Sequence, residues 1–390
     1  MDITKLKSSI TDKIDESRQQ LTDLCLKIHA NPELGFQEYK AAQWLTEHLS
    51  ENGFTVERNI GDLPTAFRAT YGEGLPAIAV LAEYDALPEV GHACGHNLIA
   101  TSAVAAGIAA AIAVSELGGS VVVIGTPAEE LYGGKILMAE RGAFDHIDIA
   151  MMVHPGVQDL VTIETLACQT LDVEFFGREA HAAAQPEAGI NALEAMVQSF
   201  TAINSLRQHT SEKSRIHGII TDGGQAANIV PAHSAGNFLV RAETDDYLDE
   251  LKQKVINCFS GAAIATGARL EYRWAETRYA AMRNNLTLAR LFQQNMQSLG
   301  RATRFSEPGF NFGSTDMGNV SKLVPSIHPF VAIAPNNVIA HSPDFARAAA
   351  SPAGIQGLID AAKAMAMTIA DLLADKEMIT MAREEFVQKK

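Results

Sequence analysis

The stretch PAIAVLAEYDALPEVGHACGHNLIATSAVAAGIAAAIAV, residues 76–114, decides the fold. It opens with a continuous apolar run, Ala77–Ala82, which is typical of a strand covered on both faces in a mostly parallel sheet. It closes with an alanine-rich run, Leu98–Val114, which favours a buried helix. We expect this run to be too short and too weakly apolar to span a membrane. A buried strand, a glycine-flanked turn and a buried helix in this order indicate an α/β domain.

Two more apolar runs follow, SVVVIGTPAEE at residues 120–130 and IDIAMMVHPG at residues 147–156. We expect each of them to form another buried strand of the same sheet. The three predicted strands end in polar residues, namely Asp85, Glu129 with Glu130, and His154. Because ligands bind at the carboxyl ends of the strands in open α/β sheets, we expect these side chains to converge on one edge.

The pattern changes near Leu166 and describes an inserted unit up to about Glu276. Its predicted elements are the strand LDVEFFG (171–177), the helix NALEAMVQSFTAINSLRQH (191–209), the strands RIHGIITDGG (215–224) and GNFLVRAE (236–243), the helix YLDELKQKVINCFSGAAIAT (247–266) and the strand ARLEYRWA (268–275). The order β-α-β-β-α-β is that of a ferredoxin-like unit. We therefore predict a discontinuous α/β domain, residues 1–165 and 280–390, with an inserted ferredoxin-like lid domain, residues 166–279.

Helical patterns dominate both ends of the chain. Residues 3–52 are helical in pattern, with a break at HANPELGFQE (29–38), where Asn31-Pro32 and Gly35 interrupt the helix. After the lid, we expect a helix at residues 286–300 and short strands within residues 324–335. We place the last helix at about residues 352–374.

The chain has 390 residues and a formal net charge of −15. This acidity argues against a nucleic-acid partner, which requires a basic patch, and it gives no support for binding to an anionic membrane. The four cysteines are far apart and form no C-x-x-C pair. The sequence therefore favours a reducing cytosol, and the charged first twenty residues lack the apolar core of a signal peptide.

GHACGHN, residues 91–97, leaves three interpretations open: metal ligands, a thiol nucleophile beside a base, or an ordinary turn. Cys94 and His96 offer sulfur and nitrogen ligands that zinc-like metals accept, but a lone buried cysteine is usually a small apolar residue. A nucleophilic Cys94 would need a base that a histidine so close in sequence rarely provides. It would also leave the pair Glu129–Glu130 without a role.

Other residues strengthen the metal interpretation only as a set. Two adjacent carboxylates at a buried edge are costly without a cation, and one could bind a metal while the other acts as a general base on a water. His154 ends a predicted strand, and His341 lies in the predicted loop NNVIAHSPDF, residues 336–345. Each residue alone could be an ordinary surface acid, strand end or loop residue. Together they supply five ligands of suitable type: Cys94, His96, Glu130, His154 and His341.

The motifs of the chain occur in an order that resembles the zinc-type aminoacylase/carboxypeptidase amidohydrolases. They are EYDALP (83–88), GHACGHN, TPAEE (126–130), VHPG (153–156), GREAHAAAQPEAGINAL (177–193), GGQAANIVP (223–231) and HSP (341–343). The similarity extends from HANPELGFQE to the last helix and is strongest to the β-alanyl-lysine dipeptidase and p-aminobenzoyl-glutamate hydrolase branch. It implies a phosphorylase/hydrolase-like, mostly parallel-sheet metallohydrolase domain with an inserted ferredoxin-like lid.

The resemblance also implies two divalent metal ions, with zinc expected and manganese, cobalt or nickel as alternatives. Cys94 would bridge the two ions. Glu130 and His341 would hold one ion, and His96 and His154 would hold the other.

Further roles follow from the same resemblance. Glu129 would be the general base on the metal-bridging water, and Asp85 would orient a ligand histidine. His181 of the lid would steady the developing oxyanion, often across a dimer. Asn228 and Arg241 would contact the polar end and the carboxylate of the substrate, which suits the planar fork of arginine.

The expected reaction is hydrolysis of the amide bond of an N-acyl amino acid or small dipeptide by a cytoplasmic homodimer or higher homo-oligomer. Cleavage of longer peptides, or a non-catalytic role as a metal-binding accessory subunit of a hydrolase, is the alternative. The chain departs from the family pattern at three places: Glu83-Tyr84-Asp85 replaces Asp-Met-Asp, Asn97 replaces Asp, and Ser314-Thr315-Asp316 replaces Ser-Glu-Asp. We interpret these departures as branch markers, and His92 as a structural residue.

Overall fold

The computed structural model describes residues 2–307 and 313–388, without the side chain of Leu131. These residues form two compact units. Unit 1 contains residues 2–164, 282–307 and 315–388, and unit 2 contains residues 165–281 with residues 313 and 314. Unit 2 is therefore inserted into the sequence of unit 1, and each unit is described by itself.

Unit 1 is built on a six-stranded sheet in the order β1-β2-β4-β3-β5-β11. Its strands are β1 (Thr55–Arg58), β2 (Phe67–Glu73), β3 (Ala77–Glu83), β4 (Gly119–Thr126), β5 (Ile149–Met151) and β11 (Ser326–Ile327). β4, β3, β5 and β11 run parallel, and β1 and β2 form an antiparallel edge. The predicted mostly parallel sheet is confirmed.

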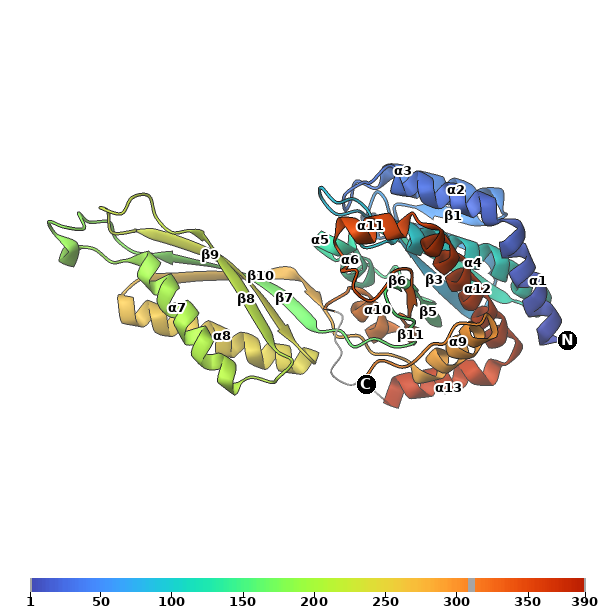
Figure 1. Ribbon diagram of the computed structural model, residues 1–390. Coiled ribbons are helices and arrows are strands. Elements are labelled where there is room, and N and C mark those ends of the chain that lie inside the picture. Colours follow the sequence, from blue (N-terminus) through green and yellow to red (C-terminus); the bar gives the residue numbers. More distant parts are fainter. Residues whose placement is uncertain (1, 308–312, 389–390) are drawn as a thin grey trace. The chain divides into compact units, whose positions relative to one another are not determined.

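The helices of unit 1 cover both faces of this sheet (Figure 1). They are α1 (Ile3–Glu16), α2 (Arg18–His29), α3 (Tyr39–Glu51), α4 (His96–Leu117), α5 (Glu129–Tyr132), α6 (Gly134–Glu140), α9 (Leu286–Ser298), α10 (Met317–Leu323), α11 (Pro343–Ala349), α12 (Pro352–Ala374) and α13 (Lys376–Gln388), with the 3-10 turn η1 (Ile60–Asp62). The break predicted at HANPELGFQE separates α2 from α3. The expectation that α12 is the last helix was wrong, because the polar sequence of α13 hides a narrow buried face of Ile379, Ala382 and Phe386.

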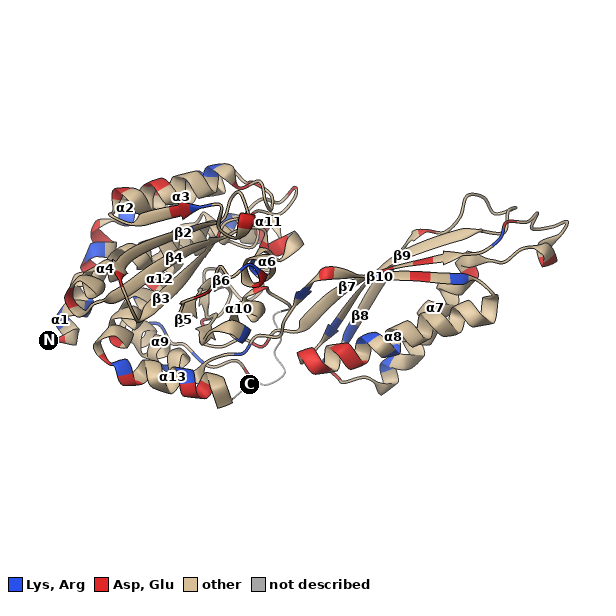
Figure 2. Cartoon of the chain, turned by 180° about the vertical axis from the view of Figure 1, so that it is seen from behind, with Lys and Arg blue, Asp and Glu red and all other residues tan. Residues whose placement is uncertain are grey.

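β3 is buried on both faces, as its continuous apolar run predicted. Ile78 and Val80 point into one core, which α4 and α12 also line, whereas Ala79 and Leu81 point into a second core shared with α6 and α10. Alternate side chains of a strand point to opposite faces, so a doubly covered strand must be apolar at every position. Charged residues lie mainly on the outer helices, such as α1, α3 and α13, and are sparse on the central strands (Figure 2).

The third predicted strand is interrupted. The run IDIAMMVHPG forms β5 in the central sheet and then β6 (His154–Gly156), which pairs in parallel with β12 (Phe330–Ala332) in a separate two-stranded sheet. His154 therefore begins a short strand of its own. It still follows the end of β5, so the predicted place of its side chain near the carboxyl edge is retained.

α4 is longer and more apolar than the sequence interpretation allowed. Its 22 residues are long and apolar enough to cross a membrane by length and composition alone, so the expectation of a run that is too short was wrong. In the described part of the chain it is the one helix of this kind. Of its most apolar window, 78% is buried inside the fold, where α4 packs against α12 and β3.

Unit 2 contains a four-stranded antiparallel sheet in the order β10-β7-β9-β8. Its elements are β7 (Ala167–Phe176), α7 (Ala192–Leu206), β8 (Arg215–Asp222), β9 (His233–Ala242), α8 (Asp245–Thr266) and β10 (Arg269–Tyr279), with the turns η2 (Pro186–Ala188) and η3 (Arg207–His209). The predicted β-α-β-β-α-β order is confirmed, and the sheet order is that of a ferredoxin-like unit. Leu171, Val173 and Phe175 alternate into a core shared with α7 and α8.

Candidate active site

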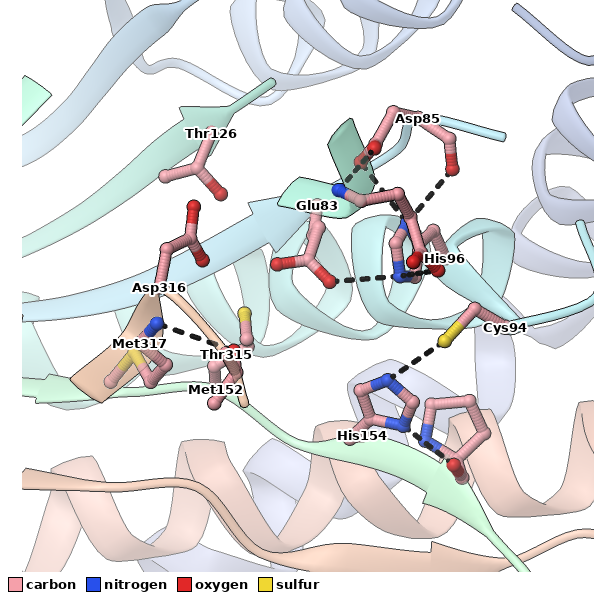
Figure 3. A network of polar contacts seen from close by, with 12 residues as sticks. Glu83, Asp85, Cys94, His96, Thr126, Met152, His154, Thr315, Asp316 and Met317 are labelled. Carbon is pink, nitrogen blue, oxygen red and sulfur yellow. Dashed lines mark hydrogen bonds and ion pairs between the residues drawn. The ribbon is translucent and has the colours of Figure 1, made fainter. Parts of the chain in front are cut away.

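Two overlapping groups of ligand-type side chains lie where the parallel strands of unit 1 end. Cys94, His96 and His154 form one group, and Cys94, Glu130 and His341 form the other. Within each group, the ligand atoms lie within 4.8 Å of one another. Cys94 Sγ lies 3.4 Å from His154 Nε2 (Figure 3). The structure thus brings together all five residues proposed as metal ligands, and Cys94 is shared by the two groups.

Asp85 holds His96 and the turn that carries Glu130. His96 Nδ1 lies 2.8 Å from the Asp85 carbonyl oxygen and 3.1 Å from Asp85 Oδ1, so Nδ1 carries the proton and Nε2 is left for another partner. The backbone N–H of Glu130 donates to Asp85 Oδ2 at 3.1 Å. Asp85 therefore links the end of β3 to the turn that follows β4, which agrees with an orienting role.

The turn between β3 and α4 requires glycine at position 95. Gly95 has a φ of 80°, in the left-handed region that other residues adopt at a cost. A Cβ atom at Gly95 would lie 2.5 Å from the Pro155 side chain. The close approach of this turn to Pro155 places Cys94 beside His154, and it explains in physical terms the second glycine of GHACGHN.

The donor set fits divalent metal ions. His96 Nε2 and Glu130 Oε1 are buried and make no hydrogen bond with described residues, although each lies near an ionic partner. Burial lowers the pKa of His154 to about 4, so this ring is neutral near pH 7. Burial, reinforced by the charge of Glu130, raises the pKa of the Cys94 thiol. Neighbouring carboxylates raise the pKa of His96 and of His341. The Cys94 thiol and these two rings would release protons when a cation binds, and a thiolate with imidazoles and a carboxylate suits zinc-like ions.

Glu129 lies beside the candidate metal ligands, at the start of α5. The ligand-type atoms of Glu83, His96 and Glu129 lie within 4.8 Å of one another. Burial and the charges of Glu83 and Asp316 raise the pKa of Glu129 well above its ordinary value. A carboxylate with a raised pKa is a better base near neutral pH than an exposed one.

A buried lysine next to this cluster was missed by the sequence analysis. Lys135 Nζ forms ion pairs with Glu83 and with Asp316 Oδ1, the latter at 2.8 Å, and all three side chains are buried. The backbone N–H of Lys135 also donates to Asp316 Oδ2 at 2.9 Å. Glu83 Oε1 lies 3.0 Å from His96 Nε2. Glu83, interpreted above as a branch marker, and Asp316 therefore neutralise an internal cation beside the site.

The other departures from the family pattern have structural partners. Asn97 is buried, and its Nδ2 donates to the Ala349 carbonyl and to Cys25 Sγ, both at 3.1 Å. It therefore ties the start of α4 to the end of α11. Thr315 Oγ1 accepts from the N–H of Met317, which opens α10. His92 is buried and stacks on the ring of His29 at 6.0 Å, in line with the structural role proposed for it.

His181 and Asn228 lie in adjoining loops of unit 2. The N–H of Ala182 donates to the Asn228 carbonyl at 3.0 Å. His181 is exposed, and its Nδ1 accepts from the N–H groups of Ala183 at 3.2 Å and Ala184 at 3.1 Å. Because Nδ1 accepts, the proton of the neutral ring is on Nε2, which makes Nε2 a hydrogen-bond donor.

Arg241 lies far from His181 within unit 2. Arg241 is paired with Cys168 near one end of the sheet, whereas His233, at the start of β9, is paired with Phe176 at the other end. The chain leaves Phe176 toward the loop of His181. The strand from residue 233 to residue 241 extends about 27 Å at about 3.4 Å per residue. The structure therefore brings His181 and Asn228 together but not Arg241.

Known proteins resemble the chain over most of its length. The model of peptidase family M20/M25/M40 matches residues 79–367. The chain is 36% identical to the Xaa-Arg dipeptidase of Mus musculus over 98% of this chain and 92% of that protein. It is also 36% identical to a p-aminobenzoyl-glutamate hydrolase subunit of Escherichia coli (strain K12) over 75% of this chain and 65% of that protein.

Among solved structures, a Bacillus subtilis protein described as a dinuclear metal binding peptidase from the M20 family shares the fold. Its TM-score is 0.74 at 20% identity, and the match covers 92% of this chain and 99% of that chain. The family match, the two relatives and the fold agree with the resemblance carried by the motifs. The chain therefore belongs to peptidase family M20/M25/M40 and is a hydrolase of peptide or amide bonds.

Proposed function

We propose that the protein hydrolyses the amide bond of N-acyl amino acids or small dipeptides that carry a free carboxylate, with two divalent ions held by the five side chains around Cys94. The observation that carries this proposal is geometric. Cys94 belongs to both ligand groups, and Glu129 lies within 4.8 Å of the ligand atom of His96. Zinc is the proposed ion, because it accepts this mixture of sulfur, nitrogen and oxygen ligands.

Glu129 is the proposed proton carrier of the reaction. When bound, the two ions supply Lewis acidity, which acidifies a water molecule and polarises the substrate carbonyl. Glu129 takes a proton from that water as the new C–O bond forms at the carbonyl carbon. The C–N bond then breaks, and Glu129 delivers the proton to the leaving amine nitrogen. One amide and one water thus become one acid and one amine.

The relatives support the substrate class. The Xaa-Arg dipeptidase and the p-aminobenzoyl-glutamate hydrolase are named for a dipeptide and for an acyl-amino acid. Arg241 is our proposed partner for the substrate carboxylate, because a guanidinium binds a carboxylate with two parallel hydrogen bonds. Arg241 Nε is buried and has no hydrogen-bond partner among the described residues.

We also propose that each active site uses two copies of the chain. A dipeptide extends only about 7 Å along its backbone. His181 and Arg241 of one copy are separated by most of the roughly 27 Å length of β9, so both cannot contact one such substrate. A symmetric homodimer resolves this, with His181 Nε2 and Asn228 supplied by one subunit and Arg241 by the other. His181 would then donate its hydrogen bond to the developing oxyanion.

The test is an activity screen of metal-reconstituted protein. Zinc, manganese, cobalt or nickel would be loaded, and N-acyl amino acids, Xaa-Arg and β-alanyl dipeptides, and p-aminobenzoyl-glutamate would be offered. We expect Glu129→Gln to keep its metal content and to lose about 10²–10⁴-fold in kcat. Glu47→Gln, the same change on the exposed face of α3, is the control and should leave kcat unchanged. Full turnover by Glu129→Gln, or no hydrolysis of any substrate by metal-loaded wild-type protein, would refute the proposal.

A further inference from the structure

The segment Asn31–Glu38, which separates α2 from α3, has no part in the mechanism above. It nevertheless contacts the loops that carry the site residues. The Glu33 carbonyl accepts from the N–H of Ala86, the residue after Asp85, at 2.8 Å. Gly35 packs so closely on Ala128, the residue before Glu129, that a Cβ atom at Gly35 would lie 2.9 Å from Ala128 Cβ. One segment therefore supports the ends of both β3 and β4.

Within this segment, Glu33 rather than Glu38 caps the N-terminus of α3. Glu38 is the N-cap residue of α3 but makes no capping hydrogen bond with its side chain. The carboxylate of Glu33 caps α3 instead, and it accepts from the N–H of Lys40 at 2.9 Å and of Ala41 at 3.0 Å. The side chain of Glu38 is thereby released from the helix end and is fully buried in unit 1.

The buried carboxyl of Glu38 reaches the turn that carries the proposed catalytic glutamate. Glu38 Oε1 accepts from the N–H of Ala128 at 2.9 Å, and Glu38 Oε2 accepts from Thr65 Oγ1 at 2.8 Å. Ala128 is itself fully buried, so its N–H would have no water to replace Glu38. The second carboxyl oxygen of Glu38 thus has a partner of its own, separate from the contact with Ala128.

Ala128 has an unusual backbone conformation. Its φ of 60° and ψ of 43° are left-handed, which costs free energy for a residue with a Cβ atom. Such a conformation persists only where its surroundings impose it. Glu129 and Glu130 follow directly, so the dihedral angles of Ala128 set where both carboxylates point.

We propose that Glu38 is a positioning residue, which holds Ala128 in the left-handed conformation so that Glu129 and Glu130 reach the reacting groups and the metal. The inference rests on the roles proposed above for Glu129 and Glu130. On this inference, the function of the HANPELGFQE motif is to hold the turn after β4 in its conformation. Oxygen at the position of Oε1 is the feature that matters, because an acceptor for one N–H is what Ala128 requires.

The test compares four variants in the metal-loaded protein. Glu38→Leu removes the acceptor and should lower kcat about 100-fold, as expected for a misplaced catalytic group, while KM changes less than about 3-fold. Glu38→Gln keeps an oxygen for Ala128 and should retain kcat within about 3-fold. Gly35→Ala displaces Ala128 from the other side and should lower kcat in the same manner as Glu38→Leu. Thr65→Val, which removes only the second partner of Glu38, is the matched control and should leave kcat nearly unchanged.

A second measurement separates positioning from general destabilisation. Because Glu130 shares the displaced turn, competition with a chromophoric chelator should show about tenfold weaker binding of one zinc ion in Glu38→Leu but not in Glu38→Gln. If Glu38→Leu does not fold, Glu38→Asp, which is one methylene shorter, takes its place. Wild-type kcat in a folded Glu38→Leu or Glu38→Asp protein would overturn the inference, as would an equal loss in Thr65→Val. Wild-type turnover by Glu129→Gln would instead overturn the proposed function.

Discussion

Cys94 is the residue on which both ligand groups depend. Its replacement by alanine should lower the metal content, because each group would then keep only two protein ligands. Elemental analysis of protein dialysed against a weak chelator measures this directly. Cys258→Ala, which removes a thiol from α8 in unit 2, is the control and should leave the metal content unchanged. An unaltered metal-to-protein ratio in Cys94→Ala would contradict the bridging role.

The burial of Glu38 leads us to predict how the stability of the protein depends on pH. Burial, followed by the charge of Asp85, raises the pKa of Glu38 to about 7. The ordinary value is about 4.5, so between the two values the unfolded chain releases this proton while the native protein retains it. The free energy of unfolding should therefore fall as pH rises from about 4.5 to about 7, by about 1–3 kcal/mol for this group.

Glu38→Gln isolates that contribution. The titratable groups that face Glu38 are Asp85 and Tyr84, and the variant leaves both in place. Urea unfolding of metal-free wild-type and variant protein, from pH 4 to pH 8, removes the separate pH dependence of metal binding. The difference in unfolding free energy between the two proteins should change within the window and level off on either side. A difference that is constant across the window would contradict a raised pKa.

At the scale of elements, Lys135 joins three of them. It lies in α6, and its ammonium pairs with Glu83 at the end of β3 and with Asp316 before α10. Burial alone would lower its pKa, but the charges of Asp316 and Glu83 outweigh this and keep the amine protonated. Lys135→Met should leave two buried carboxylates without their ammonium partner and cost about 3–5 kcal/mol of stability. Chemical unfolding of the variant measures this loss.

A double substitution provides the control for that experiment. Lys135→Met combined with Asp316→Asn leaves only one buried carboxylate without its ammonium partner, so it should be more stable than Lys135→Met alone. Additive losses in the double variant would mean that Lys135 and Asp316 do not interact energetically.

What the sequence could predict at this scale was local. The apolar run of β3, the polar residues at the strand ends and the β-α-β-β-α-β order are patterns within short windows, and the structure agrees with them. The division of IDIAMMVHPG into β5 and β6 was missed, because it depends on β12, whose Phe330 pairs with His154 from far along the chain. A break imposed by a distant partner leaves no mark on the run itself.

The supports of the site were missed for a related reason. The Glu38–Ala128 contact joins residues 90 positions apart, and the Lys135–Asp316 contact joins residues 181 positions apart. In a sequence, a glutamate near a helix start or a lysine within a helix is typical of a solvated face. That such a charge is buried can be inferred only when its distant partner is known. The candidate ligands stand out in the sequence because metal-binding residue types are distinctive, whereas the residues that position them are not.

For the whole molecule, the separation of His181 and Arg241 within unit 2 leads us to predict that two inactive variants can restore activity to each other. His181→Ala and Arg241→Ala should each abolish most activity in homodimers, because each active site then lacks one of the two groups. Mixed dimers should recover one complete site, formed by Arg241 of the His181→Ala subunit and His181 of the Arg241→Ala subunit. After unfolding and joint refolding of the two variants in equal amounts, we expect about a quarter of wild-type activity, since about half of the dimers are mixed and each has one good site of two.

The same experiment distinguishes the alternatives. Each variant refolded alone is the control, because it passes through the same procedure without forming mixed dimers. His181→Ala refolded together with Glu47→Gln is the positive control for mixing. The Glu47→Gln subunit carries both wild-type groups, so these mixed dimers should also have one complete site. Two copies that each kept both groups in their own site would show no recovery when His181→Ala and Arg241→Ala are mixed. That outcome would contradict the shared site. Both groups would then have to reach one substrate from a single copy, across the roughly 27 Å of strand that separates them.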